Sequence, residues 1–216
     1  AALGMRPALA APTGQVDPPP AARLLKGPVY ELRIYVANED RFQHLIKRFR
    51  NHTDRIFRKH GLEPMGYWIT SEGRGSKGRR FVYVLKHPSR YAAYRNWNSF
   101  TRDREWEAVL DIPEFQRLLA EKPTSIFMTQ NDYSAASRDA IDKAGGVYEL
   151  RTCVASPGKL ARLNARFRDH TTRLFTKHGI RNMGYWTPFD MPEAGNTLIY
   201  LVHHVSREQA DASWMA

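Results

Sequence analysis

Two five-residue segments carry the same alternation of apolar and charged residues, VYELR at 29–33 and again at 147–151. In a strand, Glu31 and Arg33 share one face and their apolar neighbours share the other. We expect helices to cover the apolar face, so that these charges and their counterparts Glu149 and Arg151 point into a shared interior. Charges in an enclosed interior must pair or bind something polar. Two interpretations stay open: a structural Glu–Arg network, or a ligand pocket that includes Trp68, Tyr83, Trp186 and Tyr200.

Four histidines extend the apolar stripes of two predicted helices, at His52, His60, His170 and His178. On the packed side of a helix such imidazoles could ligate haem or transfer protons. The alternative is structural, because a histidine in the last helical turn complements the free carbonyls and the helix dipole. Eight residues of helix span about 12 Å, too far for two histidines to share one metal.

Other catalytic or metal-binding patterns are not apparent in the sequence. We find no Ser/His/Asp or Cys/His arrangement and no cluster with metal-ligand spacing, and the single Cys153 excludes an internal disulfide. The run GRGSKG at 73–78 matches G-x-G-x-x-G. A dinucleotide site needs a strand before this motif and a helix after it, whereas here a strand follows. We therefore expect a basic hairpin loop.

An internal repeat organises the elements that must position these residues. Aligned at a spacing of 118, positions 29–68 and 147–186 share 22 identities in 40 positions. After a one-residue deletion the alignment continues through Tyr83/Tyr200, His87/His204 and Trp97/Trp214. The chain therefore carries two copies of one unit.

Each copy has the same predicted order of elements. In the first copy we expect strands at 29–35, 65–70, 81–86 and 125–129 and helices at 40–60 and 90–107, with Gly61 as a left-handed cap. This βαββαβ order is the ferredoxin-like unit, whose strands lie in the order 4-1-3-2. We expect an α+β fold of two tandem ferredoxin-like units.

Four segments follow from this reading: an Ala/Pro-rich disordered leader at 1–28, a first domain at 29–133, a linker at 134–146 and a second domain at 147–216. The second copy ends about 30 residues before its full length, so we expect it to be truncated and to expose the backbone of its first strand.

Ala8-Leu9-Ala10 fits a signal-peptidase site, which favours export to the periplasm. A cytoplasmic protein with a disordered leader is the alternative.

The charge and hydrophobicity of the chain bear on whether it binds nucleic acid or spans a membrane. A net charge of +11 and a pI near 9.9 favour anionic ligands, but the basic residues are dispersed, so we expect no nucleic-acid partner. No apolar run has the roughly 18 residues of a membrane helix.

The motifs VYELR, PGK, FRxH, FxKHG and GYW together resemble the NIPSNAP family, closely over 147–214 and nearly as well over 29–132. The resemblance departs at 38–40, where Asn-Glu-Asp stands in place of the second copy's Ser-Pro-Gly. It implies a dimeric α/β-barrel architecture, which tandem copies could form as an intrachain pseudo-dimer, or as a homo-oligomer. For eukaryotic members it implies roles in vesicle trafficking, mitochondrial quality control and haem handling, without a catalytic motif.

Two functions stay open. The chain is a module that binds a small molecule or a protein partner in or around the barrel, with no certain cofactor. Alternatively, it is a haem-binding or cofactor-free oxidoreductase or monooxygenase, by analogy of fold.

Overall fold

In the computed structural model, two ferredoxin-like units pack their sheets face to face. The structure describes residues 25, 27–70, 79–134, 141 and 145–216. The glycine-rich run at 73–78, most of the leader and most of the linker lie outside the described residues.

The first unit contains four strands and the helices that cover them. Its elements are β1 (Val29–Val36), a 3-10 turn (Glu39–Arg41), α2 (Phe42–Arg48), a π-helical turn (Phe49–Thr53), α3 (Asp54–Lys59), β2 (Glu63–Ile69), β3 (Arg80–His87), α4 (Arg90–Thr101), α5 (Arg104–Asp111), a second 3-10 turn (Pro113–Phe115) and β4 (Thr124–Gln130).

The second unit repeats this order as far as its second helix. Its elements are β5 (Val147–Val154), α7 (Leu160–Arg166), a π-helical turn (Phe167–Thr171), α8 (Thr172–Lys177), β6 (Arg181–Pro188), a 3-10 turn (Ala194–Asn196), β7 (Thr197–His204) and α9 (Arg207–Met215). Gly61 and Gly179 follow α3 and α8 with φ of +70° and +77°, so both glycines end their helices as the sequence predicts.

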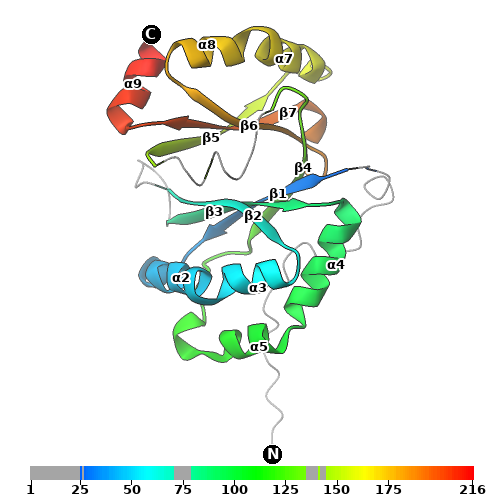
Figure 1. The fold of residues 1–216 in the computed structure, drawn as a ribbon, viewed down its shortest axis with the longest axis vertical. Coiled ribbons are helices and arrows are strands. Elements are labelled where there is room, and N and C mark those ends of the chain that lie inside the picture. The colour runs from blue at the N-terminus through cyan, green and yellow to red at the C-terminus, as the bar shows by residue number, and fades with distance from the viewer. Residues whose placement is uncertain (1–24, 26, 71–78, 135–140, 142–144) are drawn as a thin grey trace, which may run out of the picture.

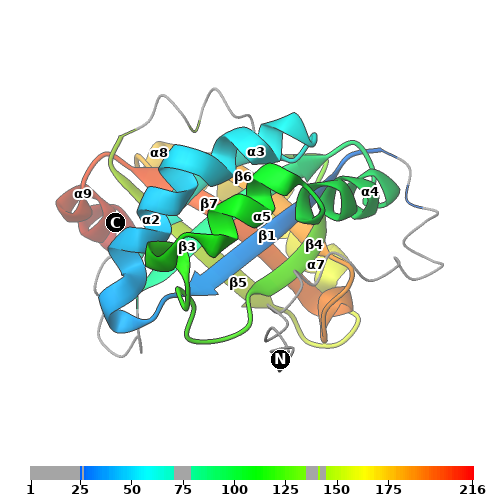
Figure 2. The same cartoon turned by 90° about the horizontal axis from the view of Figure 1, so that it is seen from below.

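One antiparallel seven-stranded sheet runs through both units in the order β2-β3-β1-β4-β6-β7-β5. The first four strands confirm the predicted order 4-1-3-2. The units join where Met128–Gln130 of β4 pair with Trp186–Pro188 of β6. Figure 1 shows four layers, with α2–α5 below the first half of the sheet and α7–α9 above the second half. Figure 2 looks onto the helices of the first unit, with the strands behind them.

The helix expected over 90–107 is divided into α4 and α5. Asp103 separates them, and its carboxylate accepts hydrogen bonds from the backbone N–H groups of Glu105 (2.7 Å) and Trp106 (3.3 Å). An aspartate in this position caps the start of a new helix. The new direction lets α5 bury Trp106 and Val109 in the first unit's core.

The strand faces are the reverse of the expectation. Tyr30 and Leu32 of β1 face the space between the two half-sheets, where they pack with Trp186 and other residues of the second unit. Glu31 and Arg33 instead lie under the helices of their own unit, so the prediction that the charges of the two repeats pair across a shared interior is wrong. The space between the half-sheets takes apolar side chains from both units, whereas the helix layer supplies the polar partners described below.

Candidate functional site

A buried polar network lies between β1 and α4 of the first unit. Glu31 Oε1 accepts hydrogen bonds from Arg33 Nη1 at 3.0 Å and from Ser125 Oγ at 2.7 Å. Its Oε2 accepts one from Trp97 Nε1 at 2.7 Å and lies 3.2 Å from His87 Nε2. The side chains of Glu31 and Arg33 are both 0% exposed. Every carboxylate oxygen thus has two partners, as a buried charge requires.

This network keeps both members of the central pair charged. Burial alone raises the pKa of Glu31, but Arg33, His87 and Ser125 outweigh it and hold the pKa at about 2. Burial acts to lower the pKa of Arg33, yet Tyr35, Tyr83 and Glu31 raise it overall. An ion pair formed in this way is closed to solvent, which favours the structural interpretation in the first unit.

The second unit repeats the network in a more open setting. Arg151 Nη1 donates to Glu149 Oε2 at 3.0 Å, and Trp214 Nε1 donates to Glu149 Oε1 at 2.8 Å. His204 Nε2 lies 3.2 Å from the same oxygen. However, Glu149 is 20% exposed and Arg151 is 43% exposed, and the guanidinium lies 4.4 Å from the Trp214 ring centre. The second motif thus keeps the Arg–Glu and Trp–Glu hydrogen bonds of the first, but it lacks the histidine hydrogen bond and is more exposed.

The difference in access has a clear origin in the sheet. β1 pairs with β3 on one side and with β4 on the other. β5 pairs with β7, and among the described residues it has no strand on its other side. In the first unit Ser125 of β4 covers the glutamate. The equivalent place beside β5 is therefore an open edge next to a partly exposed ion pair.

A small apolar groove lies between α8 and α9. It has a volume of about 180 Å³ and is lined by Leu174, Phe175, His178, Ile180, Ser213 and Trp214. Leu174 is 52% exposed and Trp214 is 38% exposed. In the first unit the counterparts of Phe175 and Trp214 are covered by Phe100, whose ring centre lies 4.9 Å from that of Phe57 and 5.6 Å from that of Trp97.

The eight residues predicted to bind a ligand divide between two layers. Trp68 and Trp186 lie in the space between the half-sheets. Tyr83 and Tyr200 lie under the helices of their own units, as do the four charged residues of β1 and β5. The structure therefore does not bring these residues together around one pocket. Their assignment as ligand-binding residues stays a prediction.

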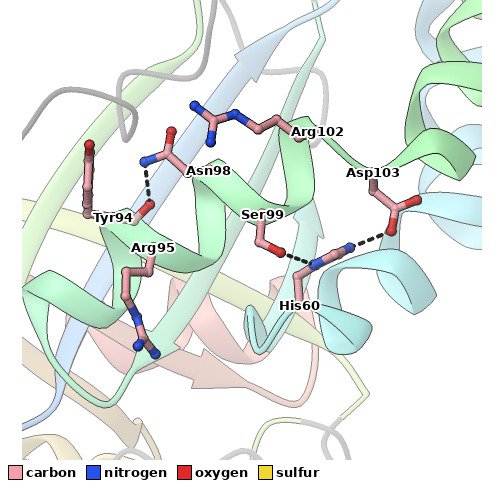
Figure 3. Close-up of a pocket in the computed structure, with 7 residues that line it drawn as sticks. All are labelled: His60, Tyr94, Arg95, Asn98, Ser99, Arg102 and Asp103. Carbon is pink, nitrogen blue, oxygen red and sulfur yellow. Dashed lines mark hydrogen bonds and ion pairs between the residues drawn. The ribbon is translucent and has the colours of Figure 1, made fainter.

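A surface groove on α4 holds an arrangement that the sequence analysis did not find. Ser99 Oγ lies 2.8 Å from His60 Nδ1, and His60 Nε2 lies 2.6 Å from Asp103 Oδ2 (Figure 3). Arg95 and Arg102 also line this groove, whose volume is about 620 Å³. The expectation that no Ser/His/Asp arrangement exists is thus wrong. The three residues lie up to 43 positions apart along the sequence, but the fold brings their side chains together.

The same contacts indicate what this arrangement does. The other oxygen of Asp103 caps α5, and Lys59 Nζ lies 2.6 Å from Oδ2, the oxygen that also contacts His60. Hydrogen bonds from Lys59 and His60 lower the pKa of Asp103 to about 2. The Asp103 carboxylate thus caps α5 and contacts Lys59 and His60 at the end of α3. Through the contact of His60 with Ser99, α4 is connected to the same cluster. We therefore interpret the cluster as a link between helices.

The four histidines that the sequence suggests as haem ligands do not form a haem pocket. Both ring nitrogens of His60 are engaged in the helix link. His52 packs its ring against Phe115 at 5.5 Å, and His170 is exposed. His178 lines the groove of about 180 Å³, which is below the roughly 300 Å³ of small-molecule sites. The described residues thus do not fit a haem ligated by these histidines, and they contain no group of three or more His, Cys, Asp or Glu placed to hold a metal ion.

Within the described part of the chain, no helix combines the length and the apolar character that crossing a bilayer requires.

Comparison of the structure with solved ones shows which fold the chain has. A candidate monooxygenase from Fusobacterium nucleatum matches with a TM-score of 0.54 at 10% identity, over 89% of this chain and 82% of the other. A second candidate monooxygenase, from Lactobacillus acidophilus, matches with a TM-score of 0.53 at 12% identity, over 88% and 83%. Both similarities extend over the two units. The chain has the fold of a dimeric α/β barrel, built here as a pseudo-dimer within one chain.

The family follows from the sequence of the first unit. Residues 30–134 match the NIPSNAP family model. A NIPSNAP-like domain protein from Burkholderia xenovorans is similar to one half of the chain, with 17% identity and a TM-score of 0.45 over 51% of this chain and 90% of that protein. No curated protein matches the sequence. Residues 30–134, which make up the first unit, therefore form a NIPSNAP domain.

Proposed function

We propose that this protein binds an extended segment of a polypeptide as a further strand along the edge of β5 that no described strand covers. The observation that carries the proposal is the contrast between two strands of nearly identical sequence. β1 has a strand on each side and its ion pair is 0% exposed, whereas β5 has one neighbouring strand in the described part of the chain and its ion pair is 20% and 43% exposed. An unpaired strand edge is a ready template for a further strand.

Contacts across the barrel support one added strand rather than an extended stack. Trp68 of β2 and Tyr148 of β5 lie at opposite ends of the sheet order, yet their ring centres are 5.7 Å apart. The sheet therefore curls until its two open ends approach each other. In the first unit, β4 pairs with both β1 and β6. A segment in the equivalent place would lie between β5 and β2 and would close the ring.

The exposed apolar residues at the edge add a second source of affinity. Val154, at the end of β5, is 55% exposed, and Trp214, which contacts Glu149 and Arg151 of the same strand, is 38% exposed. Burial of apolar area stabilises such a complex by about 25 cal/mol per Å² before the costs of association. Main-chain hydrogen bonds to β5 and burial of these residues would then act together.

The single cysteine of the chain offers a direct test. Cys153 lies on β5, and directly opposed residues of antiparallel strands have Cα atoms about 4.5–5.5 Å apart, within the range of a disulfide. We would incubate the protein with an alternating Val–Thr peptide whose one cysteine is activated as a thiopyridyl disulfide, so that the Cys153 thiolate attacks the peptide sulfur and releases thiopyridone, and with the same peptide N-methylated on alternate amides. We expect mixed disulfide at Cys153 to form rapidly with the first peptide and slowly with the second.

Two variants separate edge pairing from ordinary thiol exchange. Val154→Lys should slow trapping, because a lysine on an edge strand opposes pairing. Tyr91→Lys is the matched control, since Tyr91 is also 55% exposed but lies on α4 of the first unit. If the N-methylated peptide is trapped as fast as its parent, no strand forms along β5 and the proposed function is wrong.

A further inference from the structure

The groove on α4 differs from its surroundings in the state of its charged residues. Arg95 and Arg102 line it and are exposed, and within the described part of the chain neither of them forms an ion pair. On the neighbouring helix α2, by contrast, the exposed Lys47 has a carboxylate partner, Glu114 at 3.0 Å. The groove therefore presents two guanidinium groups whose charges are not neutralised by a carboxylate.

The acidic residue in the groove does not oppose an anionic ligand. Among the described residues that line the groove, only Asp103 has a carboxylate, and its side chain is 6% exposed. One of its oxygens lies 2.6 Å from both Lys59 Nζ and His60 Nε2, and the other accepts a hydrogen bond from the backbone at the start of α5. An incoming anion thus meets two cations and a carboxylate that is already neutralised.

The size of the groove and the spacing of its arginines suit a small molecule. Its volume of about 620 Å³ falls within the roughly 300–1,000 Å³ of small-molecule sites. Arg95 and Arg102 are seven residues apart on one face of α4, so their Cα atoms are about 10.5 Å apart along the helix, and Asn98 lies between them (Figure 3). A guanidinium group binds phosphate or carboxylate through two parallel hydrogen bonds. A ligand with two such groups could therefore engage both arginines.

The second repeat shows that the fold does not require this cationic surface. In the alignment of the two repeats, Tyr94 and Arg95 of α4 correspond to Asp211 and Ala212 of α9. Both helices nevertheless begin in the same way, with a serine side chain as the N-cap. The charge of this helix face is thus particular to the first unit, whereas the helix and its cap belong to the structure that the two units share.

We propose that the groove on α4 binds a small molecule with two anionic groups, phosphates or carboxylates, one for Arg95 and one for Arg102. The site lies in the first unit and does not depend on the proposed binding at β5. The helix link through Asp103 supports it by neutralising the carboxylate that would repel the ligand.

The probes are hexanediol bisphosphate and hexyl phosphate, each titrated into the full chain by calorimetry at the same ionic strength, because salt screens exposed charges. We expect the bisphosphate to bind at least about tenfold more tightly, since the first phosphate brings the second close to its arginine. Arg95→Ala and Arg102→Ala should each remove most of this advantage. The double variant Tyr94→Asp/Arg95→Ala, which carries the residues of the second repeat, should lose the advantage and keep the melting temperature of the parent chain.

The control is Arg162→Ala, which removes an exposed arginine from α7 on the other side of the molecule (Figure 1) and should leave both affinities unchanged. An equal loss in this variant would mean that the net charge of +11, rather than a site, attracts the anions, and would overturn the proposal. Absence of binding, or equal affinity for the two probes, would also overturn it. A single-stranded oligonucleotide that bound more tightly than the bisphosphate, with the same dependence on Arg95, would refute the assignment to a small molecule.

Discussion

Replacing Arg33 with Met tests whether burial, rather than sequence, sets the energy of the repeated Glu–Arg pair. The change leaves the Glu31 carboxylate buried with one partner fewer, at a site that is 0% exposed. Breaking a buried ion pair by removing one partner costs about 3–5 kcal/mol. The matched change Arg151→Met removes the same contact where the arginine is 43% exposed, and exposed pairs contribute about 0–1 kcal/mol.

Urea unfolding at pH 7 measures the difference. With a slope of about 2 kcal/mol per molar urea, Arg33→Met should lower the midpoint by about 2 M and Arg151→Met by at most about 0.5 M. Both tryptophan fluorescence and circular dichroism should be followed, because two units can unfold separately. The double variant Glu31→Gln/Arg33→Met should recover part of the loss, since no unpaired charge is then buried. Equal costs for the two single variants would refute the assignment of the energy to burial.

Three further changes test the surrounding structure. The pKa of Glu31 is lowered to about 2 in the folded chain and is about 4.3 in an unfolded one. Its contribution to the stability of the fold is therefore present above about pH 4.3 and is lost as the pH falls towards 2. Over this pH range the melting temperature of Glu31→Gln should fall less steeply than that of the parent chain. Asp103→Ala should cost about 1–2 kcal/mol in urea unfolding through loss of the α5 cap, and Asp103→Asn should cost less. Gly184→Ala should cost about 1–3 kcal/mol because the new methyl group meets the ring of Trp186, whereas Gly195→Ala, with nothing within 4 Å, should change stability by less than about 0.5 kcal/mol.

Much of the fold can be predicted from the sequence because its signals are local and occur twice. The alternation of β1 and β5, the glycines after α3 and α8, and the order of the elements all depend on neighbours along the chain. The division of α4 from α5 was missed. An aspartate within a helical pattern starts a new helix only when its side chain turns back to the backbone, and Asp103 does so while Lys59 and His60 compensate its charge.

The reversed strand faces have a different cause. The prediction placed charges away from the helices because amphipathic helices usually present apolar side chains to a sheet. Here α4 presents the Trp97 indole N–H, β3 presents His87, and β4 presents Ser125, all to one carboxylate. These donors come from three elements that are distant in the sequence. Only their common position in both repeats, as with His204 and Trp214, could have indicated that they meet.

Comparison of the two copies of the network distinguishes the hydrogen bonds that the motif forms by itself from those that depend on a neighbouring strand. Both copies form the same Arg–Glu and Trp–Glu hydrogen bonds, with lengths that agree within 0.1 Å (3.0 and 3.0 Å; 2.7 and 2.8 Å). The internal geometry therefore does not depend on the strand beside it, and the partly exposed copy on β5 is already arranged to receive one. A prearranged site loses less conformational entropy on binding than one that must form. This prearrangement supports the proposed binding at β5, whereas the closed copy on β1 is expected to contribute stability.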